Sequence, residues 1–566
     1  MKRRELFQAL GLIVAASMVL AACGGATTPP PATEPPATEP PATEPPMAFE
    51  PVAPLTAASC DYGGFFQEIA AVDEHTVRFT LCKPDPAFLS KIAFSVFSIY
   101  PSEWLEATGA TGEALEAPVG TGAYTVGEWA RGESITFNRF EDYWGEPAEN
   151  DTLVFRWSTE SAARLLELQA GTVDGIDNVA PSDFATVEGD ATLQLQVRPA
   201  LNVFYIGIQR NQAPFDNVEV RQALAMGIDR QLIVDIYYPE GSEVASHFTP
   251  CAIPNACEGD PWYDFDPEAA RAMLTEAGYP DGFETTLSYR NVVRGYLPEV
   301  VQVAGEIQRQ LEVNLGITAE VIEMESGAFI DATAVGDVQG LHLLGWGADY
   351  PHVTNFLDYH FPEAQLQFGA AHPEIYEHLT EGAQIADAAE AAPVYEQANN
   401  AIRELVPLIP VAHGGSALAY RADVTGAHAS PLSNEYFGVM DPGGRTTFVW
   451  MQNGEPPNLF CADETDGEAL RACEQVTEAL YSYEVGGTAV QPALAEACVP
   501  NADLTEYICT LRQGVLFHDG SSLDANDVVV TFTMGLDAAS PLHVGNTGVF
   551  EYYCFLWSAC LNVPEG

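Results

Sequence analysis

Alternation of apolar and polar positions marks secondary structure along most of the chain. Residues 76–81 (TVRFTL) alternate with the two-residue period of a half-buried strand. Residues 161–170 (SAARLLELQA) have helical spacing and end at Gly171, and residues 218–229 place their apolar side chains on one helical stripe. Residues 306–315 are a further candidate helix. This mixture predicts a chain built of α/β or α+β layers.

Two helix starts carry capping signals. Asp266 precedes Pro267, which is the arrangement of an N-cap followed by proline in the first turn, and the helical pattern then continues to Gly278. Asp524 stands before Ala525 in the same way and is expected to cap a second helix. Both helices should therefore begin at these positions.

The first 22 residues have the pattern of an export signal. Three basic residues, Lys2, Arg3 and Arg4, precede an apolar stretch over residues 9–20 that is too short to span a bilayer. The following Leu20-Ala21-Ala22-Cys23-Gly24 resembles a bacterial lipobox. That resemblance implies that residues 1–22 are removed and that Cys23 becomes a lipidated N-terminus. An ordinary signal peptide with a chance cysteine and a twin-arginine signal remain alternatives.

Residues 24–46 repeat Pro-Ala-Thr-Glu-Pro three times. Such a segment cannot bury a core and favours extended polyproline II, so residues 23–46 are expected to form a lipidated cysteine followed by a spacer. No later stretch reaches 18 consecutive apolar residues. The mature protein is therefore expected to be anchored to a membrane without crossing it.

Length and charge narrow the class of protein. The chain has 566 residues, which suggests two or three domains, and its formal net charge is -57, with 80 acidic and 23 basic residues. A surface of this kind repels phosphate backbones and anionic lipid headgroups, so no nucleic-acid partner is expected. The charge is typical of a soluble exported protein, and attraction of cationic solutes is the alternative.

Ten of the eleven cysteines remain after Cys23 is set aside. An even number in an exported chain, without CxxC spacing, predicts structural disulfides and no metal site. The sequence does not determine their connectivity. Proximity along the chain favours the pairs Cys251 with Cys257, Cys461 with Cys473, Cys498 with Cys509 and Cys554 with Cys560, leaving Cys60 and Cys82.

Six segments carry motifs that name a family. They are residues 117–124 (APVGTGAY), 138–145 (NRFEDYWG), 168–174 (LQAGTVD), 214–223 (PFDNVEVRQA), 511–520 (LRQGVLFHDG) and 523–528 (LDANDV). Together they resemble family 5 of the bacterial extracellular solute-binding proteins, which includes oligopeptide-, dipeptide- and nickel-binding proteins. The resemblance covers nearly all of residues 60–560.

The roles expected for these motifs are structural. Gly120 and Gly122 are expected to adopt turn dihedrals that are closed to other residues. Asp519 and Gly520 form a turn signal. None of these residues is expected to be catalytic.

The resemblance implies an α/β, two-lobed periplasmic-binding-protein-like fold (type II, class C-like) with discontinuous lobes that close over a solute. It also implies a monomeric lipoprotein at the outer face of the cytoplasmic membrane or in the periplasm. Such a protein delivers a small solute, and a peptide is the solute expected here, to the permease subunits of an ABC importer. No cofactor and no catalytic residue are expected. A surface enzyme with paired carboxylates and a sensor or assembly protein of the same fold are the alternatives.

The order of the motifs departs from the family. The block at 511–520 belongs near the family's mature N-terminus, yet here it follows residues 407–411, which resemble the family's closing segment. Residues 441–445 (DPGGR) would join the two old ends by a short turn, and termini of a domain often lie close together. We therefore expect a circular permutation, with a tandem gene fragment truncated at Gly566 as the alternative.

Permutation predicts a discontinuous domain layout. Residues 47–207 are expected to form the first part of lobe I with an accessory subdomain, and residues 208–409 to form lobe II. Residues 410–444 would return to lobe I and provide the link, and residues 445–566 would complete lobe I.

The segment at residues 345–351 (GWGADYP) resembles the family's WxaDYpdP motif. Matched residue by residue, it implies that Asp349 pairs with the α-ammonium of a peptide and that Trp346 lines a side-chain pocket, with Gly345 beside them. A carboxylate in a closed, water-poor cleft binds an ammonium group strongly. The alternative is that Asp349 only caps a turn before Pro351. The sequence departs from the motif at residues 352–354 (HVT), which puts the pocket's chemistry in doubt.

Other polar and aromatic residues are weaker candidates. Tyr205, Trp262, Tyr289, Arg290 and Arg294 are expected mostly in the core or on the surface. His360, His372 and His378 lack the spacing of a helical metal pair and are expected to be solvated.

Overall fold

The computed structural model describes residues 49–563 except 293, 364–365 and 386. Residues Phe49–Gly566 form one compact unit. The predicted export signal, the lipidation site at Cys23 and the Pro-rich spacer lie outside the described residues. None of the helices in the described part of the chain has both the length and the hydrophobicity needed to cross a bilayer.

A five-stranded sheet combines the two ends of the compact unit. Its order is β1 (Leu55–Thr56), β2 (Phe66–Asp73), β3 (Thr76–Leu81), β20 (Glu506–Leu511) and β19 (Ala495–Pro500). β3 occupies the residues predicted from their alternation and buries every second side chain. The helices of this part are α1 (Phe88–Lys91), α2 (Ser102–Thr108), α14 (Ala525–Leu536) and α15 (Glu551–Leu556), and a hairpin of β17 (Tyr481–Tyr483) and β18 (Val490–Pro492) adjoins it.

A seven-stranded sheet also joins distant segments. Its order is β4 (Tyr124–Ala130), β5 (Ser134–Arg139), β6 (Thr152–Trp157), β16 (Thr447–Gln452), β7 (Gly175–Ile176), β15 (Ser416–Arg421) and β8 (Leu193–Arg198). β16 runs parallel to both β6 and β7. Helices α3 (Ser161–Gln169), α4 (Phe184–Glu188) and α13 (Gly467–Cys473) belong to this part.

A six-stranded sheet forms the third layer. Its order is β10 (Glu243–Val244), β14 (Leu408–His413), β9 (Asn202–Ile208), β13 (Leu341–Gly347), β11 (Glu284–Arg290) and β12 (Thr318–Met324). Its helices are α5 (Val218–Gly227), α6 (Arg230–Tyr237), α7 (Pro267–Glu276), α8 (Val300–Leu315), α9 (Ser326–Ala334), α10 (Val353–His360), α11 (Pro373–Gly382) and α12 (Ala388–Leu405). One continuous core of buried residues runs from Leu201 to Ala412 in this layer.

These layers form two lobes. We name the five- and seven-stranded sheets with their helices the first lobe, and the six-stranded sheet with its helices the second lobe. The chain passes between them at residues 199–201, from β8 to β9, and at residues 414–415, from β14 to β15. Since β9 and β14 both lie in the six-stranded sheet, these crossings differ by a few residues from the boundaries expected at 207 and 409.

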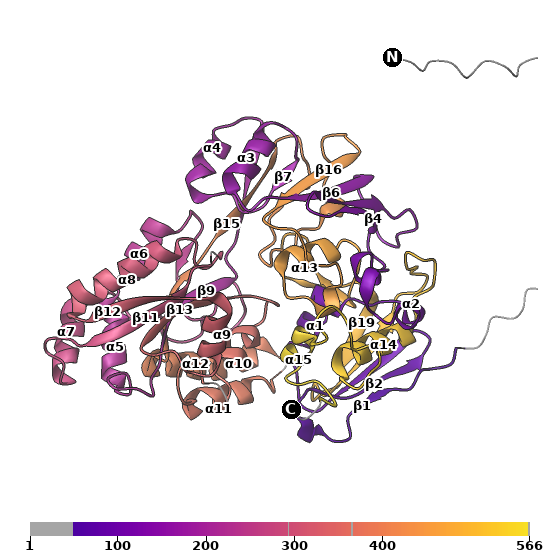
Figure 1. Cartoon of the computed structure of the whole chain (residues 1–566). Coiled ribbons are helices and arrows are strands. Elements are labelled where there is room, and N and C mark those ends of the chain that lie inside the picture. Colours follow the sequence, from indigo (N-terminus) through magenta and orange to yellow (C-terminus); the bar gives the residue numbers. More distant parts are fainter. Residues whose placement is uncertain (1–48, 293, 364–365, 386, 564–566) are drawn as a thin grey trace, which may run out of the picture. The chain divides into compact units, whose positions relative to one another are not determined.

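The C-terminal segment is part of the first lobe. β20 pairs antiparallel with β3, and β16 pairs with β6. Figure 1 shows the orange and yellow elements β16 and β19 beside the indigo and purple elements of the first part of the chain. Two family motifs also meet here, because the backbone N–H of Gly120 donates to Nδ1 of His518 at 3.3 Å and the backbone N–H of His518 donates to the carbonyl of Gly120 at 2.9 Å.

Gly120 and Gly122 are needed for a reason other than the expected one. Neither has a left-handed backbone. A Cβ at Gly120 would lie 2.3 Å from the carbonyl oxygen of Val476, and a Cβ at Gly122 would lie 2.6 Å from the carbonyl carbon of the same residue. The expectation of special dihedrals was wrong, and the glycines instead let the backbone of residues 476–477 approach closely.

The capping signals are confirmed. The Asp266 side chain accepts a hydrogen bond from the backbone N–H of Ala269 at 2.9 Å, and α7 begins at Pro267. Asp524 caps α14 in a capping box completed by Asp527. The start of α8 lies six residues before the predicted 306, because the pattern alone does not show its first turns.

Five disulfides are present among the described residues. The neighbours expected to pair do so: Cys251–Cys257, Cys461–Cys473, Cys498–Cys509 and Cys554–Cys560. Cys60 pairs with Cys82. Cys498 and Cys509 face each other across β19 and β20, so this bridge closes one hairpin of the first lobe.

Candidate functional site

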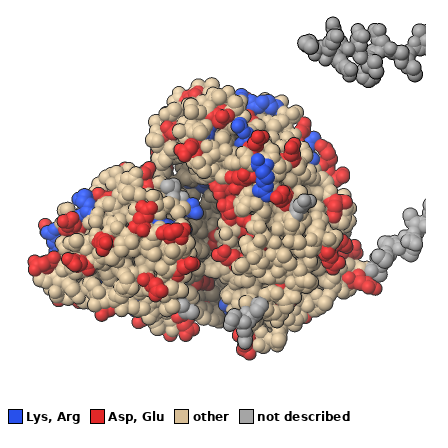
Figure 2. All heavy atoms as spheres, in the orientation of Figure 1, with Lys and Arg blue, Asp and Glu red and all other residues tan. Residues whose placement is uncertain are grey.

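A cavity of about 750 Å³ lies between the two lobes. The second lobe contributes residues of β13 and the loop after it, and the first lobe contributes residues of α13 and α15. Figure 2 shows a groove between these two parts, with acidic side chains gathered beside it over α13. The volume falls within the ~300–1,000 Å³ that is usual for small-molecule sites.

Asp349 lies on this cavity, in the loop between β13 and α10. Its Oδ2 accepts a hydrogen bond from Nδ2 of Asn355 at 2.9 Å, and its Oδ1 accepts one from the hydroxyl of Tyr552 at 2.9 Å. Burial raises the pKa of Asp349 to about 6; the two hydrogen bonds oppose this shift, and the negative charge of Glu551 adds to it. The carboxyl group therefore changes charge close to neutral pH.

The sequence left open that the Asp349 side chain only caps the turn before Pro351, but a different side chain forms the hydrogen bonds of this turn. The Asn355 side chain takes that role, because its Oδ1 accepts from the backbone N–H of Asp349 at 3.1 Å and from Nε1 of Trp346 at 3.0 Å. His352 caps α10 by accepting from the backbone N–H of Thr354 at 3.3 Å. The Asp349 carboxylate is thus directed at α15 and the cavity.

Trp346 forms an aromatic wall of the cavity. Its ring stacks on Tyr359 with centroids 4.2 Å apart, and Phe555 of α15 stands 6.1 Å from it. All three residues line the cavity. Flat aromatic surfaces of this kind bind apolar groups and backbone amides alike.

Gly345 also lines the cavity, but close packing explains the absence of a side chain. A Cβ at this position would lie 2.3 Å from the ring of Tyr296 and 2.5 Å from the carbonyl oxygen of Val203 in β9. A larger residue would force the Tyr296 ring or the backbone of β9 to move. Gly345 therefore shapes the site through its neighbours.

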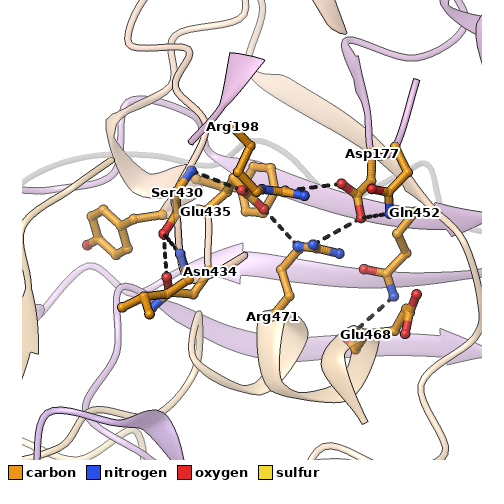
Figure 3. Close-up of polar contacts among 12 residues, drawn as sticks. Asp177, Arg198, Ser430, Asn434, Glu435, Gln452, Glu468 and Arg471 are labelled. Atoms are coloured by element: carbon orange, nitrogen blue, oxygen red, sulfur yellow. Dashed lines mark hydrogen bonds and ion pairs between the residues drawn. The ribbon is translucent and has the colours of Figure 1, made fainter. Parts of the chain in front are cut away.

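A charge network of four residues, Asp177, Arg198, Glu435 and Arg471, borders the cavity in the first lobe (Figure 3). Nη2 of Arg198 lies 3.1 Å from Asp177 and 2.8 Å from Glu435. Arg471 contacts the same two carboxylates at 3.0 and 2.8 Å. The side chains are at most 7% exposed, so each arginine is paired with two carboxylates and each carboxylate with two arginines.

The network sets the charge state of its members. Burial opposes ionisation of Asp177, but Arg471 and Arg198 hold the pKa of that carboxyl below its usual range. Nearby Glu474 is shifted in the opposite direction: burial and the negative charge of Glu435 raise its pKa well above the usual value, and Arg471 and Asn434 offset this only in part. The first-lobe side of the cavity therefore carries Glu474, which favours its neutral form, beside the charge network, in which positive and negative charges balance.

The aromatic and arginine residues named as weaker candidates differ in whether they line the cavity. Tyr205, Arg290 and Arg294 line the cavity, whereas Trp262 and Tyr289 are not among its lining residues. Arg290 donates to the hydroxyl of Ser326 at 3.1 Å and makes no ion pair with a carboxylate in the described part of the chain. It is a cationic group on the same cavity as Asp349.

The histidines are less exposed than expected. His360 is 1% exposed and packs against Tyr205 and Trp346, because it lies on the face of α10 that covers the second-lobe core. His372 is also buried, and burial lowers the pKa of both rings to about 3. Only His378 is half-exposed. The expectation of solvated side chains was therefore wrong for His360 and His372.

One group of metal-ligating residue types occurs among the described residues. Ligand atoms of His247, Cys251 and Cys257 lie within 4.8 Å of one another. The two sulfur atoms form a disulfide, which leaves neither cysteine as the thiolate that metals bind.

Several residues of the site were not predicted from the sequence. Tyr552 and Phe555 lie in an aromatic-rich stretch, VFEYYCFLW at residues 549–557, that reads as core. Arg471 is the one basic residue in a helical stretch that contains the acids Asp466, Glu468 and Glu474, and this is the signal that could have marked it. Asp177, Arg198 and Glu435 carry no local signal, because they become a unit only when three separate segments meet.

Comparison with known proteins identifies the family to which the chain is similar. It matches the family described as "Bacterial extracellular solute-binding proteins, family 5 Middle" over residues 47–367 and 489–548. The dipeptide-binding protein of Pseudomonas aeruginosa is 31% identical over 381 residues, which are 66% of this chain and 71% of that protein. Heme-binding protein A of Haemophilus influenzae is 30% identical over 387 residues, covering 67% of this chain and 70% of that protein.

Solved structures agree. HbpA2 from Haemophilus parasuis is 31% identical with a TM-score of 0.59, covering 67% of this chain and 75% of that one. A dipeptide-binding protein from Pseudoalteromonas sp. SM9913, in complex with Met-Leu, is 27% identical with a TM-score of 0.56 and the same coverage. With its two lobes, the cavity between them and these relatives, the chain belongs to the bacterial extracellular solute-binding proteins of family 5.

Proposed function

We propose that this protein captures a short peptide outside the cytoplasmic membrane and delivers it to an ABC importer. The observation that carries the proposal is the carboxylate of Asp349 on a cavity between two lobes. A peptide's α-ammonium would bind there through a charge-assisted hydrogen bond, which is strong where water is excluded. Arg290 on the same cavity would suit the peptide's carboxylate.

The relatives support a peptide as the solute. They include dipeptide-binding proteins, a structure in complex with Met-Leu and, from Helicobacter pylori, an ABC transporter-associated periplasmic binding protein in complex with the peptide STSA at 25% identity and a TM-score of 0.54. Delivery to an importer follows from the same comparison.

Haem is the solute named for one relative. The described residues that line the cavity include no histidine, cysteine or methionine, which hold the iron in most haem proteins. Five tyrosines line it, namely Tyr205, Tyr296, Tyr359, Tyr483 and Tyr552, and tyrosine is also a ligand of haem iron. The binding test therefore includes haem beside the peptides.

We propose a binding role and no catalytic one, with Cys23 as the lipid anchor. Two acidic residues of the cavity are paired with neighbours: Asp349 with Asn355 and Tyr552, and Asp177 with two arginines. Such pairing favours recognition over proton transfer. The lipobox-like sequence at residues 20–24 supports the anchor.

We also propose that the chain is a circular permutant. The start of the compact unit lies against its end: the backbone N–H of Val52 donates to Oδ1 of Asn526 at 2.9 Å, and that of Phe65 donates to the carbonyl of Trp557 at 3.0 Å. The second matched block of the family, 489–548, contains the motif at 511–520. In this arrangement residues 445–563 complete the first lobe and supply α13 and α15 to the cavity.

The test of the proposed function is binding of a free dipeptide or tripeptide, measured by calorimetry. We expect Asp349→Ala to weaken binding tenfold or more, because the cationic end of the peptide loses its counter-ion. Asp235→Ala is the matched control, since Asp235 is an exposed acid of α6 and does not line the cavity. The same calorimetry is done with an N-acetylated peptide, which lacks the α-ammonium group, and with haem.

The affinity should also depend on pH. Burial raises the pKa of Asp349 to about 6, so the carboxylate that pairs with the ammonium group is lost as the pH falls through 6. The peptide's own α-amino group loses its charge above about pH 8. Affinity is expected to be highest between these values. Equal binding of the free and acetylated peptides, or unchanged affinity in Asp349→Ala, would remove Asp349 from the site.

A further inference from the structure

The carboxylate of Asp349 is held from two directions. Asn355, which donates to Oδ2, belongs to α10 in the same lobe. Tyr552, which donates to Oδ1, belongs to α15 in the first lobe. One of the two hydrogen bonds therefore exists only while the lobes are together.

The hydroxyl of Tyr552 has a defined position because α15 is fixed on both sides. The Tyr552 ring packs edge-on against Phe94 with centroids 5.2 Å apart. Phe555, one turn along, packs against Tyr359 of the second lobe at 4.9 Å. The Cys554–Cys560 disulfide closes the turn that follows α15.

The segment that carries Asp349 is also held across the cleft. Tyr350, its neighbour in the chain, is 4% exposed and lies in the buried core of the first lobe. The Tyr350 hydroxyl and Thr354 lie within hydrogen-bonding distance, at 3.2 Å. The loop between β13 and α10 is thus seated in the first lobe at the point where Tyr552 reaches Asp349.

We propose that Tyr552 is a positioning residue for solute recognition, through which the C-terminal segment organises the ammonium site. Its hydroxyl fixes Oδ1 of Asp349 toward the cavity and favours the anionic form before the solute arrives. When the lobes separate, this bond breaks and the site loses part of its affinity for a cation. The inference rests on the proposed function, since it assigns Asp349 to an ammonium group.

The surroundings of Asp349 explain why a hydroxyl matters there. Burial raises the pKa of this carboxyl, Asn355 and Tyr552 lower it, and Glu551 raises it. Among the described residues, the ionisable groups with the strongest electrostatic coupling to Asp349 are Glu551 and Tyr552 of α15, Tyr350, Tyr359 of α10 and Tyr483 of β17, and none of these five carries a positive charge. Hydrogen bonds therefore support the anion in the absence of solute.

The decisive variant is Tyr552→Phe, which removes the hydroxyl and keeps the ring that packs on Phe94. The first measurement is the titration of Asp349 without solute, by NMR of protein labelled with ¹³C at the aspartate carboxyl carbons and assigned with Asp349→Asn. A hydrogen bond to a charged group accounts for a shift of about one pH unit, so we expect the midpoint to rise by about that amount. Glu551→Gln should lower the midpoint of the Asp349 titration, because a neighbouring negative charge is removed.

The second measurement is affinity for the free dipeptide across pH. Tyr552→Phe should weaken binding by about fivefold at pH 6 and by less than about threefold at pH 8, where Asp349 is ionised with or without the hydroxyl. A merely structural role would weaken binding equally at both pH values. That result, or an unchanged titration of Asp349, would overturn the inference.

Tyr289→Phe is the matched control. Tyr289 also donates its hydroxyl to a carboxylate, that of Glu323 at 2.9 Å, and does not line the cavity. The affinity of Tyr289→Phe for the free dipeptide and the titration of Asp349 in this variant should match those of the wild type. If the wild type binds no peptide, the proposed function fails, and the solute-free titration still decides whether Tyr552 positions Asp349.

Discussion

Asp177 shows how much a single buried group determines in this protein. It lies in the charge network with Arg198, Glu435 and Arg471, where its own side chain is 1% exposed. Desolvating such ions is costly, and the arrangement is stable only because every charge is matched. Removing one carboxylate leaves two arginines sharing a single acid beside the solute cavity.

We therefore predict that Asp177→Asn destabilises the protein by about 3 kcal/mol or more in urea unfolding at pH 7, since an uncompensated buried charge remains. The pKa of Asp177 is lowered in the folded state, so its contribution is present above the unfolded pKa of about 4 and is lost as the pH falls below it. The difference between wild type and variant should shrink there.

Glu116→Gln is the comparison for that measurement. Glu116 pairs with Arg131 at 2.6 Å, but the two side chains are 49% and 44% exposed. A solvated pair of this kind contributes about 0–1 kcal/mol. A loss in Asp177→Asn no larger than in Glu116→Gln would contradict the role given to the network.

At the scale of elements, α15 is a short helix with a large part in the site. It has six residues, too few to be stable alone, and three of them, Glu551, Tyr552 and Phe555, line the cavity. Its order comes from packing against the second lobe and from the Cys554–Cys560 bridge. The element that presents Tyr552 thus depends on tertiary contacts.

Replacing both cysteines of this bridge with serine should lower stability by about 2–3 kcal/mol and weaken peptide binding, because α15 loses its closure. The double variant Cys251→Ser/Cys257→Ser provides the control. It opens a bridge of the same six-residue separation that does not line the cavity. Chemical unfolding and calorimetry on both variants should give a similar stability loss and an affinity loss only in the first. Equal affinity in the two would show that α15 keeps its place without the bridge.

At the scale of the whole molecule, the first lobe is built from both halves of the chain. Because β20 pairs with β3 and β16 pairs with β6, neither sheet of the first lobe is complete in residues 49–444 alone. The close passage of residues 476–477 past Gly120 and Gly122 adds a second interlocking contact. The C-terminal segment thus supplies strands to both sheets of the first lobe.

We predict that residues 49–444 alone do not fold cooperatively, whereas a reordered chain does. In that chain residues 445–563 come first and are joined to 49–444 by a short Gly/Ser linker, which the contact between Phe65 and Trp557 makes feasible. Circular dichroism and thermal unfolding should match the original for the reordered chain. A cooperative, fully folded 49–444 fragment would contradict the permutation.

The sequence by itself determined the local structure and the family. β3 and the caps of α7 and α14 depend on residues a few positions apart, so periodicity and capping rules were sufficient to predict them. The motif at 345–351 likewise identified Asp349 and Trp346 by resemblance, and both lie on the cavity.

Tertiary structure alone decided what surrounds them. The bond from Tyr552 joins residues 203 positions apart, and that between Arg198 and Glu435 joins residues 237 apart. Gly120 and Gly345 must lack a side chain because the backbone or an aromatic ring of a distant segment lies too close to them. The burial of His360 depends on which face of α10 packs against the core. Local patterns record what each residue favours, whereas these contacts arise only when separate segments are brought together by folding.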